Sequence, residues 1–134
     1  MKKVVLTLLA VIASTWVCLL SASGDTFELL KGATTTGAGK VVDVSYAEFR
    51  SWSCDVLVSD STATAVKVRI EGNQGGSLFA PGGMAEYTLT VPELAAGIGS
   101  FSITDIPVNV IRANLVTLTG GSSPAVTVKC TGVK

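Results

Sequence analysis

Apolar and polar residues alternate along most of the chain beyond residue 24, and glycine or proline interrupts the alternation about every 8 to 15 residues. The clearest example is the segment 66–71, which reads VKVRIE. A period of two places successive side chains on opposite faces of a strand. We therefore expect Val66, Val68 and Ile70 to be buried. The face that carries Lys67, Arg69 and Glu71 should be wet.

The same reasoning predicts about seven or eight short strands and one helical turn over 92–97, which starts with proline and ends with glycine. The strands are expected at 26–31, 40–44, 49–58, 66–71, 85–91, 98–103, 108–119 and 126–130. The predicted fold class is all-β, an antiparallel β-sandwich of jelly-roll or immunoglobulin-like type that follows an N-terminal signal helix. A partly open barrel of similar size is the alternative.

Residues 1–23 have the parts of a secretory signal peptide: a basic start at Lys2 and Lys3, an apolar run over 4–20, and then small residues. We expect 1–23 to be this signal and 24–134 to be a single β-sandwich domain. The expected location is secreted or periplasmic, with no stable membrane span after cleavage. Since the 17-residue apolar run reaches the lower limit for a membrane-spanning helix, an uncleaved anchor is the alternative.

The charge and the absence of histidine exclude several function classes. The chain has ten basic and ten acidic residues, and loss of Lys2 and Lys3 leaves eight against ten, a net charge of −2. That balance excludes a strongly basic nucleic-acid footprint. Without histidine, the chain cannot build a Ser-His-Asp or Cys-His site, and a typical zinc site is disfavoured. We expect no cofactor, no nucleic-acid partner and no enzymatic activity.

Removal of the signal would leave two of the three cysteines, Cys54 and Cys130, in a compartment where disulfides persist. Each lies on the apolar face of its own predicted strand, so a disulfide between them is the expected arrangement. The bond would close a loop of about 76 residues and contribute roughly 4.5 kcal/mol in the chain-entropy model. Two buried free thiols are the alternative. Trp52 shares the apolar face of Cys54, which favours a place in the core.

Four residues in predicted turns are candidate ligand contacts: Asp60, Asn73, Gln74 and Phe79. Turn chemistry alone also accounts for the aspartate and the asparagine. Calcium would prefer oxygen atoms like those of 60–62 or 71–74, but neither segment has the dense aspartates of a calcium loop, so no metal site is predicted. Exposed aromatic residues stack on sugar rings, and Tyr46 and Phe79 lie near turns. The expected partner is a glycan or a protein surface.

Five segments resemble the small Thr/Gly-rich β-sandwich proteins found among tailed-phage structural genes and prophage-derived proteins. They are 33–44 (ATTTGAGKVVDV), 66–72 (VKVRIEG), 103–108 (ITDIPV), 111–115 (IRANL) and 125–128 (AVTV), and they span most of the chain beyond the signal. The chain departs from these modules at 73–79, where it reads NQGGSLF. The resemblance implies a non-enzymatic surface or structural module, and the signal and cysteine pair imply an exported form of it.

The predicted function is therefore an exported, non-enzymatic β-sandwich that binds a partner or has a structural role. It would present the loops 59–62, 73–83 and 120–124. One alternative is a strand-exchanging or self-assembling surface subunit that donates its first strand, 26–31. A second is a carboxylate-dependent glycan hydrolase, which needs two acidic side chains about 5–10 Å apart across a cleft. The carboxylates are single and scattered: Asp43, Glu48, Asp55, Asp60, Glu71 and Asp105.

Overall fold

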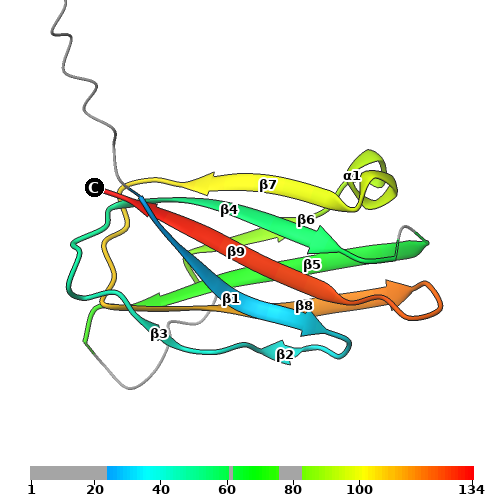
Figure 1. Cartoon of the computed structure of the whole chain (residues 1–134), viewed down its shortest axis with the longest axis horizontal. Coiled ribbons are helices and arrows are strands. Elements are labelled where there is room, and N and C mark those ends of the chain that lie inside the picture. Colours follow the sequence, from blue (N-terminus) through cyan, green and yellow to red (C-terminus); the bar gives the residue numbers. More distant parts are fainter. Residues whose placement is uncertain (1–23, 61, 76–82) are drawn as a thin grey trace, which may run out of the picture.

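The computed structural model describes residues 24–60, 62–75 and 83–134, which form two packed antiparallel sheets (Figure 1). Sheet A contains β1 (Asp25–Ala33), β9 (Val126–Val133), β4 (Ser51–Val58) and β7 (Ile98–Ile103), in that order. Sheet B contains β2 (Gly37–Ala38), β8 (Val110–Gly120), β5 (Ala63–Asn73) and β6 (Ala85–Thr88), and β3 (Val42–Asp43) also pairs with β8. One short helix, α1 (Val91–Ala96), joins β6 to β7. The predicted all-β sandwich is confirmed, and the predicted signal lies outside the described residues.

The strand order is that of a jelly roll. Four antiparallel pairs are nested along the sequence: β1 with β9, β2 and β3 with β8, β4 with β7, and β5 with β6. The β4–β9 and β5–β8 ladders then join these pairs into the two sheets. An immunoglobulin-like sandwich orders its strands differently and lacks this nesting. Of the two predicted topologies, the structure therefore has the jelly roll.

The core lies between the sheets and is built from the inward faces of their central strands. In β5, Val66, Val68 and Ile70 are fully buried, as the alternation predicts. In β4, Trp52 is 1% exposed, which confirms its place in the core. Its ring packs edge-on against Phe49, with the centroids 5.3 Å apart. The alternating pattern thus identified the buried face of both central strands.

The predicted disulfide between Cys54 and Cys130 is present, and both cysteines are fully buried. They are opposite each other on β4 and β9, with their Cα atoms 4.1 Å apart. Because β4 and β9 are neighbours in sheet A, the bond crosslinks two strands of one sheet. In antibody domains, by contrast, the disulfide beside a core tryptophan joins the two sheets.

The helical turn predicted over 92–97 is confirmed, but the strand expected before it is too long. That strand was expected to reach residue 91, yet β6 ends at Thr88, and Val91 starts α1 with 80% exposure. The reason is a capping box, in which Thr90 and Glu93 satisfy each other's backbone N–H groups at the start of the helix. Gly97 ends the helix with φ of 73°, a left-handed conformation that glycine adopts without strain.

Two further expectations are wrong. The strand expected over 40–44 is reduced to β3, because the five residues 38–42 lie opposite only four residues of β8, 111–114, and the regular pairing with β8 is interrupted between Ala38 and Val42. Glu71 was expected on a wet face but is only 5% exposed. Arg112 and Asn114 of β8 bond to its carboxylate and cover it.

Candidate functional site

The candidate contact residues lie at opposite ends of the sandwich. Asp60 precedes β5, whereas Asn73 and Gln74 lie at its other end. The eleven residues of β5 place these ends roughly 33 Å apart at the usual rise of a strand. Phe79 lies outside the described residues. The structure therefore brings Asn73 and Gln74 together and separates both from Asp60.

Asp60 holds two loops together. One carboxylate oxygen accepts hydrogen bonds from the backbone N–H (2.9 Å) and the hydroxyl (2.6 Å) of Thr62. The other accepts the backbone N–H groups of Ser122 (2.9 Å) and Ser123 (3.2 Å) in the β8–β9 loop. These bonds, first the one from the Thr62 hydroxyl, hold the pKa of Asp60 far below its usual value. Both oxygen atoms are thus engaged within the chain.

Asn73 and Gln74 connect the end of β5 to the segment before β8. Asn109 donates its backbone N–H to the Asn73 carbonyl and its side-chain amide to the Gln74 carbonyl, each at 2.8 Å. Gln74 in turn donates its side-chain amide to the Pro107 carbonyl at 2.9 Å. These contacts order both segments.

A hollow of about 340 Å³ lies beside this junction, and we call it the end hollow. Its lining residues are Gly72, Asn73, Gln74, Gly83, Met84, Ile106, Pro107 and Val108. Apolar side chains dominate the lining, and two side-chain amides are the polar groups among them. This combination suits an apolar side chain or ring that also offers a hydrogen-bonding group.

Most of the described carboxylates, though not Glu48 and Asp105, have a hydrogen-bond or ion-pair partner within the chain, and the resolved pKa shifts among the carboxylates are all downward. Hydrogen bonds from Ser45 lower the pKa of Asp43, and one from Arg69 lowers that of Glu86. A general acid in a glycosidase needs the opposite, a pKa raised toward neutrality. In 24–60, 62–75 and 83–134, no three or more metal-binding side chains (Asp, Glu, Cys or His) lie close enough to hold a metal ion.

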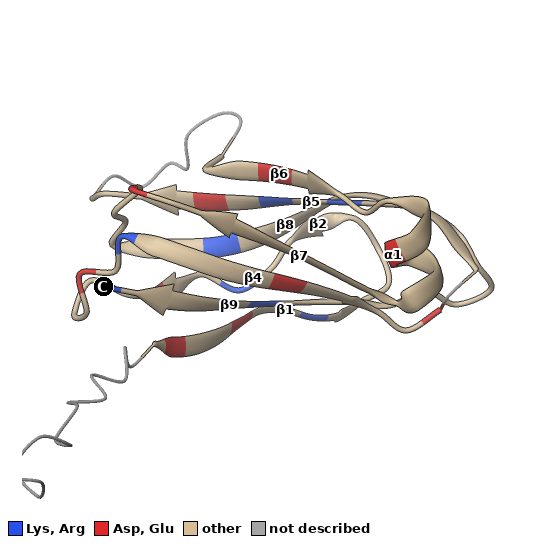
Figure 2. Cartoon of the chain, turned by 90° about the horizontal axis from the view of Figure 1, so that it is seen from above, with Lys and Arg blue, Asp and Glu red and all other residues tan. Residues whose placement is uncertain are grey.

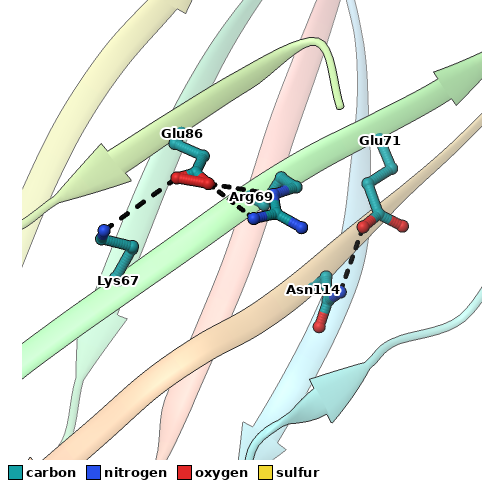
Figure 3. Close-up of polar contacts among 5 residues, drawn as sticks. All are labelled: Lys67, Arg69, Glu71, Glu86 and Asn114. Atoms are coloured by element: carbon teal, nitrogen blue, oxygen red, sulfur yellow. Dashed lines mark hydrogen bonds and ion pairs between the residues drawn. The ribbon is translucent and has the colours of Figure 1, made fainter. Parts of the chain in front are cut away.

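The outer face of sheet B carries a ladder of ion pairs (Figure 3). Glu86 of β6 accepts from Arg69 of β5 at 2.6 Å and lies 4.0 Å from Lys67. Glu71 accepts from Arg112 at 2.6 Å and from Asn114 at 3.0 Å. Burial raises the pKa of Glu71, but the bonds from Asn114 and Arg112 outweigh it and the net change is downward.

The β8 partners of Glu71 were not predicted from the sequence. The alternation identifies which face a side chain occupies, whereas the opposite residue depends on strand pairing and register. Over the described part of the chain, charges are scattered across both sheets rather than gathered into one patch (Figure 2).

Tyr46 is 67% exposed, as its place near a predicted turn suggests. Its hydroxyl donates to Asp25 at 3.2 Å, and its ring meets Phe49 edge-on at 6.4 Å. The phenol is therefore held in place at the surface. No helix in the described residues has the length and apolar character needed to cross a membrane.

No protein-family model matches the sequence, and no curated protein sequence matches it. Two solved structures share the fold at 15% identity and a TM-score of 0.51, each over 84% of this chain. One is the SPBc2 prophage-derived protein YomS, covered over 94% of its length; the other is the PBSX exported protein XepA, of which the match spans 39%. A picornavirus capsid structure from equine rhinitis A virus aligns with a TM-score of 0.48 at 13% identity, over 78% of this chain and 66% of that chain. The chain thus shares the fold of these two proteins, and this similarity concerns the fold alone.

Proposed function

We propose that this chain is an exported, non-enzymatic jelly-roll module that binds a protein or glycan surface through its end hollow. The observation that carries the proposal is the end hollow itself, which has a volume of about 340 Å³ and is lined mainly by apolar residues, with Asn73 and Gln74 among them. A smaller hollow of about 270 Å³ lies beside α1 and the start of β5, and Asp60, which precedes β5, has both carboxylate oxygens engaged within the chain. Concave apolar sites with a few polar groups are the usual form of a binding site.

Three features support export: the signal pattern over 1–23, the buried disulfide, and a structural neighbour that is itself described as exported. The test is to express the full chain in a bacterial host and to measure the intact mass of the protein recovered outside the cytoplasm. We expect the mass of 24–134, lower by two hydrogen atoms than that of the reduced form. Recovery of the full-length mass in the membrane fraction would contradict cleavage, because it would show an uncleaved anchor.

The lowered pKa values and structural partners of the carboxylates support a non-enzymatic role. The binding test uses a glycan array and a panel of purified cell-surface proteins, with Ile106→Asp to place a charge in the end hollow. Ala95→Asp adds the same charge to the smaller hollow beside α1, at the other end of the sandwich, and is the matched control. We expect binding to be lost with the first variant only. Loss of binding with Ala95→Asp alone would place the binding site at the α1 end. Release of glycan products by the wild-type protein would contradict the non-enzymatic role.

A further inference from the structure

A second hollow, of about 400 Å³, lies between the edge strands β1 and β2, and we call it the flank hollow. Its lining residues are Glu28, Leu29, Leu30, Lys31, Ala38, Gly39 and Lys40. No residue of the end hollow belongs to it. The flank hollow is therefore a separate surface.

Two lysines give the flank hollow a positive balance. The Lys31 side chain is 83% exposed and its ammonium lies 3.7 Å from the Glu28 carboxylate. Because this ion pair is exposed to solvent, its attraction is weak. Lys40 makes no ion pair with a carboxylate in the part of the chain that the structure describes. With two ammonium groups against one carboxylate, the hollow favours a ligand with negative charge.

The main chain of β1 favours an extended ligand. One edge of β1 pairs with β9, and the other edge pairs with no strand in the described residues, although the Gly39 backbone approaches it at the Leu29 carbonyl. Unpaired strand edges are the sites at which extended peptides add to a sheet. Leu29 and Leu30 are buried beneath the hollow, and the exposed Ala38 adds a small apolar side chain to its lining.

We propose that the flank hollow binds an extended acidic segment of a partner protein, with its carboxylates at Lys31 and Lys40 and its backbone along β1. This inference goes beyond the proposed function, because it concerns another surface and does not depend on the end hollow.

The test is an NMR titration of the folded domain with an octapeptide of alternating valine and glutamate. We expect shifts confined to residues 28–31 and 38–40. The affinity should fall about five- to thirtyfold in Lys31→Ala/Lys40→Ala, since two exposed ion pairs together are worth about 1–2 kcal/mol. Arg50→Ala/Lys134→Ala removes the same charge elsewhere and should bind within about twofold of wild type.

Lys31 and Lys40 are surface residues, so the double variant should fold, and Lys40→Glu alone provides a second variant with the same expected direction. Absence of binding to the wild-type protein would overturn the proposal. Equal binding of a valine–lysine octapeptide would overturn the charge argument. Equal competition by inorganic polyphosphate would show a general anion patch and overturn the strand argument. Because the variants differ from Ile106→Asp, failure here is distinguishable from failure of the proposed function.

Discussion

The two flanks of the sandwich, where an edge strand of sheet A lies beside an edge strand of sheet B, are closed in different ways. At the β6–β7 flank, the Tyr87 ring of β6 stacks on Phe101 of β7, with the centroids 4.6 Å apart and the planes at 17°. The Tyr87 hydroxyl also donates to Glu93 of α1. At the β1–β2 flank, the backbone of Gly39 comes close to the Leu29 carbonyl, and the flank hollow remains beside this contact.

The difference shows what side chains and backbone each contribute to closing a sandwich. An aromatic bridge fills the space between two edges and ties both to the helix that follows. A backbone contact brings the edges closer but leaves the space around it empty, since glycine has no side chain to fill it. A Cβ atom at Gly39 would lie 2.2 Å from the Leu29 oxygen and 2.9 Å from Leu30 Cδ1. At the β1–β2 flank, the two backbones are therefore close together at Gly39, and unfilled space remains beside that contact.

Removal of the disulfide should cause the largest loss of stability, and it should affect the two flanks unequally. We expect Cys54→Ala/Cys130→Ala to lower the free energy of unfolding by about 4 kcal/mol, measured by urea denaturation. The bond lies midway between the flanks, but β7 keeps its aromatic bridge to sheet B and β1 has none. Amide exchange should therefore accelerate more in β1 than in β7. Equal acceleration in both strands would contradict the difference between the flanks.

Gly39→Ala should destabilise the protein by about 3 kcal/mol, because the new Cβ overlaps backbone atoms that cannot rotate away. Gly32→Asn is the matched control on the same flank. Gly32 has φ of 54° and no atom within 4 Å of an added Cβ, and asparagine tolerates this conformation. Its expected cost is below about 1 kcal/mol. Urea unfolding of both variants checks the prediction, and equal costs would mean that conformation rather than space decides this flank.

Tyr87→Ala should cost about 2 kcal/mol, because it removes the stack on Phe101 and the bond to Glu93. Tyr87→Phe keeps the ring and should cost only about 1 kcal/mol. Tyr46→Ala is the control, since that ring is 67% exposed and its removal should cost less than about 1 kcal/mol. Thermal unfolding of the three variants gives the order, and a larger cost for Tyr46→Ala would contradict the bridge.

Acid should weaken the two flanks to different extents, and this is the smallest effect. Hydrogen bonds from Tyr87 and then Thr90 hold the pKa of Glu93 below its usual value of 4.5. The stabilisation is present above that value and is lost as the pH falls through the lower pKa of the folded protein. We expect the Tyr87 ring to loosen in this range while Gly39, which has no ionisable group, keeps its contact. In Glu93→Gln, NMR signals of Tyr87 should lose this pH dependence; an unchanged dependence would assign it to another group.

Local alternation predicted the buried faces well, because it depends only on which way each side chain points. Val66, Val68 and Ile70 are all fully buried. The same pattern failed for Glu71, which has the spacing of a wet residue but bonds to Arg112 and Asn114. Those partners come from a strand some forty residues away, and the register with β8 shifts at Lys67. No local pattern contains that information.

The candidate site was predicted in part. Asp60, Asn73 and Gln74 lie at strand ends, as turn residues should. Their separation follows from the length of β5, whereas their roles depend on which strands neighbour it. The carboxylate of Asp60 accepts from Ser122 and Ser123 of a loop distant in sequence, which turn chemistry does not indicate.

The sequence by itself determined the fold class, the buried faces of β4 and β5, the helical turn at Pro92 and the pairing of Cys54 with Cys130. These follow from side-chain direction and from a cysteine count, both of which are local or compositional. Only the tertiary structure decided the jelly-roll order, the single sheet that holds the disulfide, and the two unequal flanks. Each of these depends on which strands are neighbours, and burial of an apolar face favours many strand orders equally.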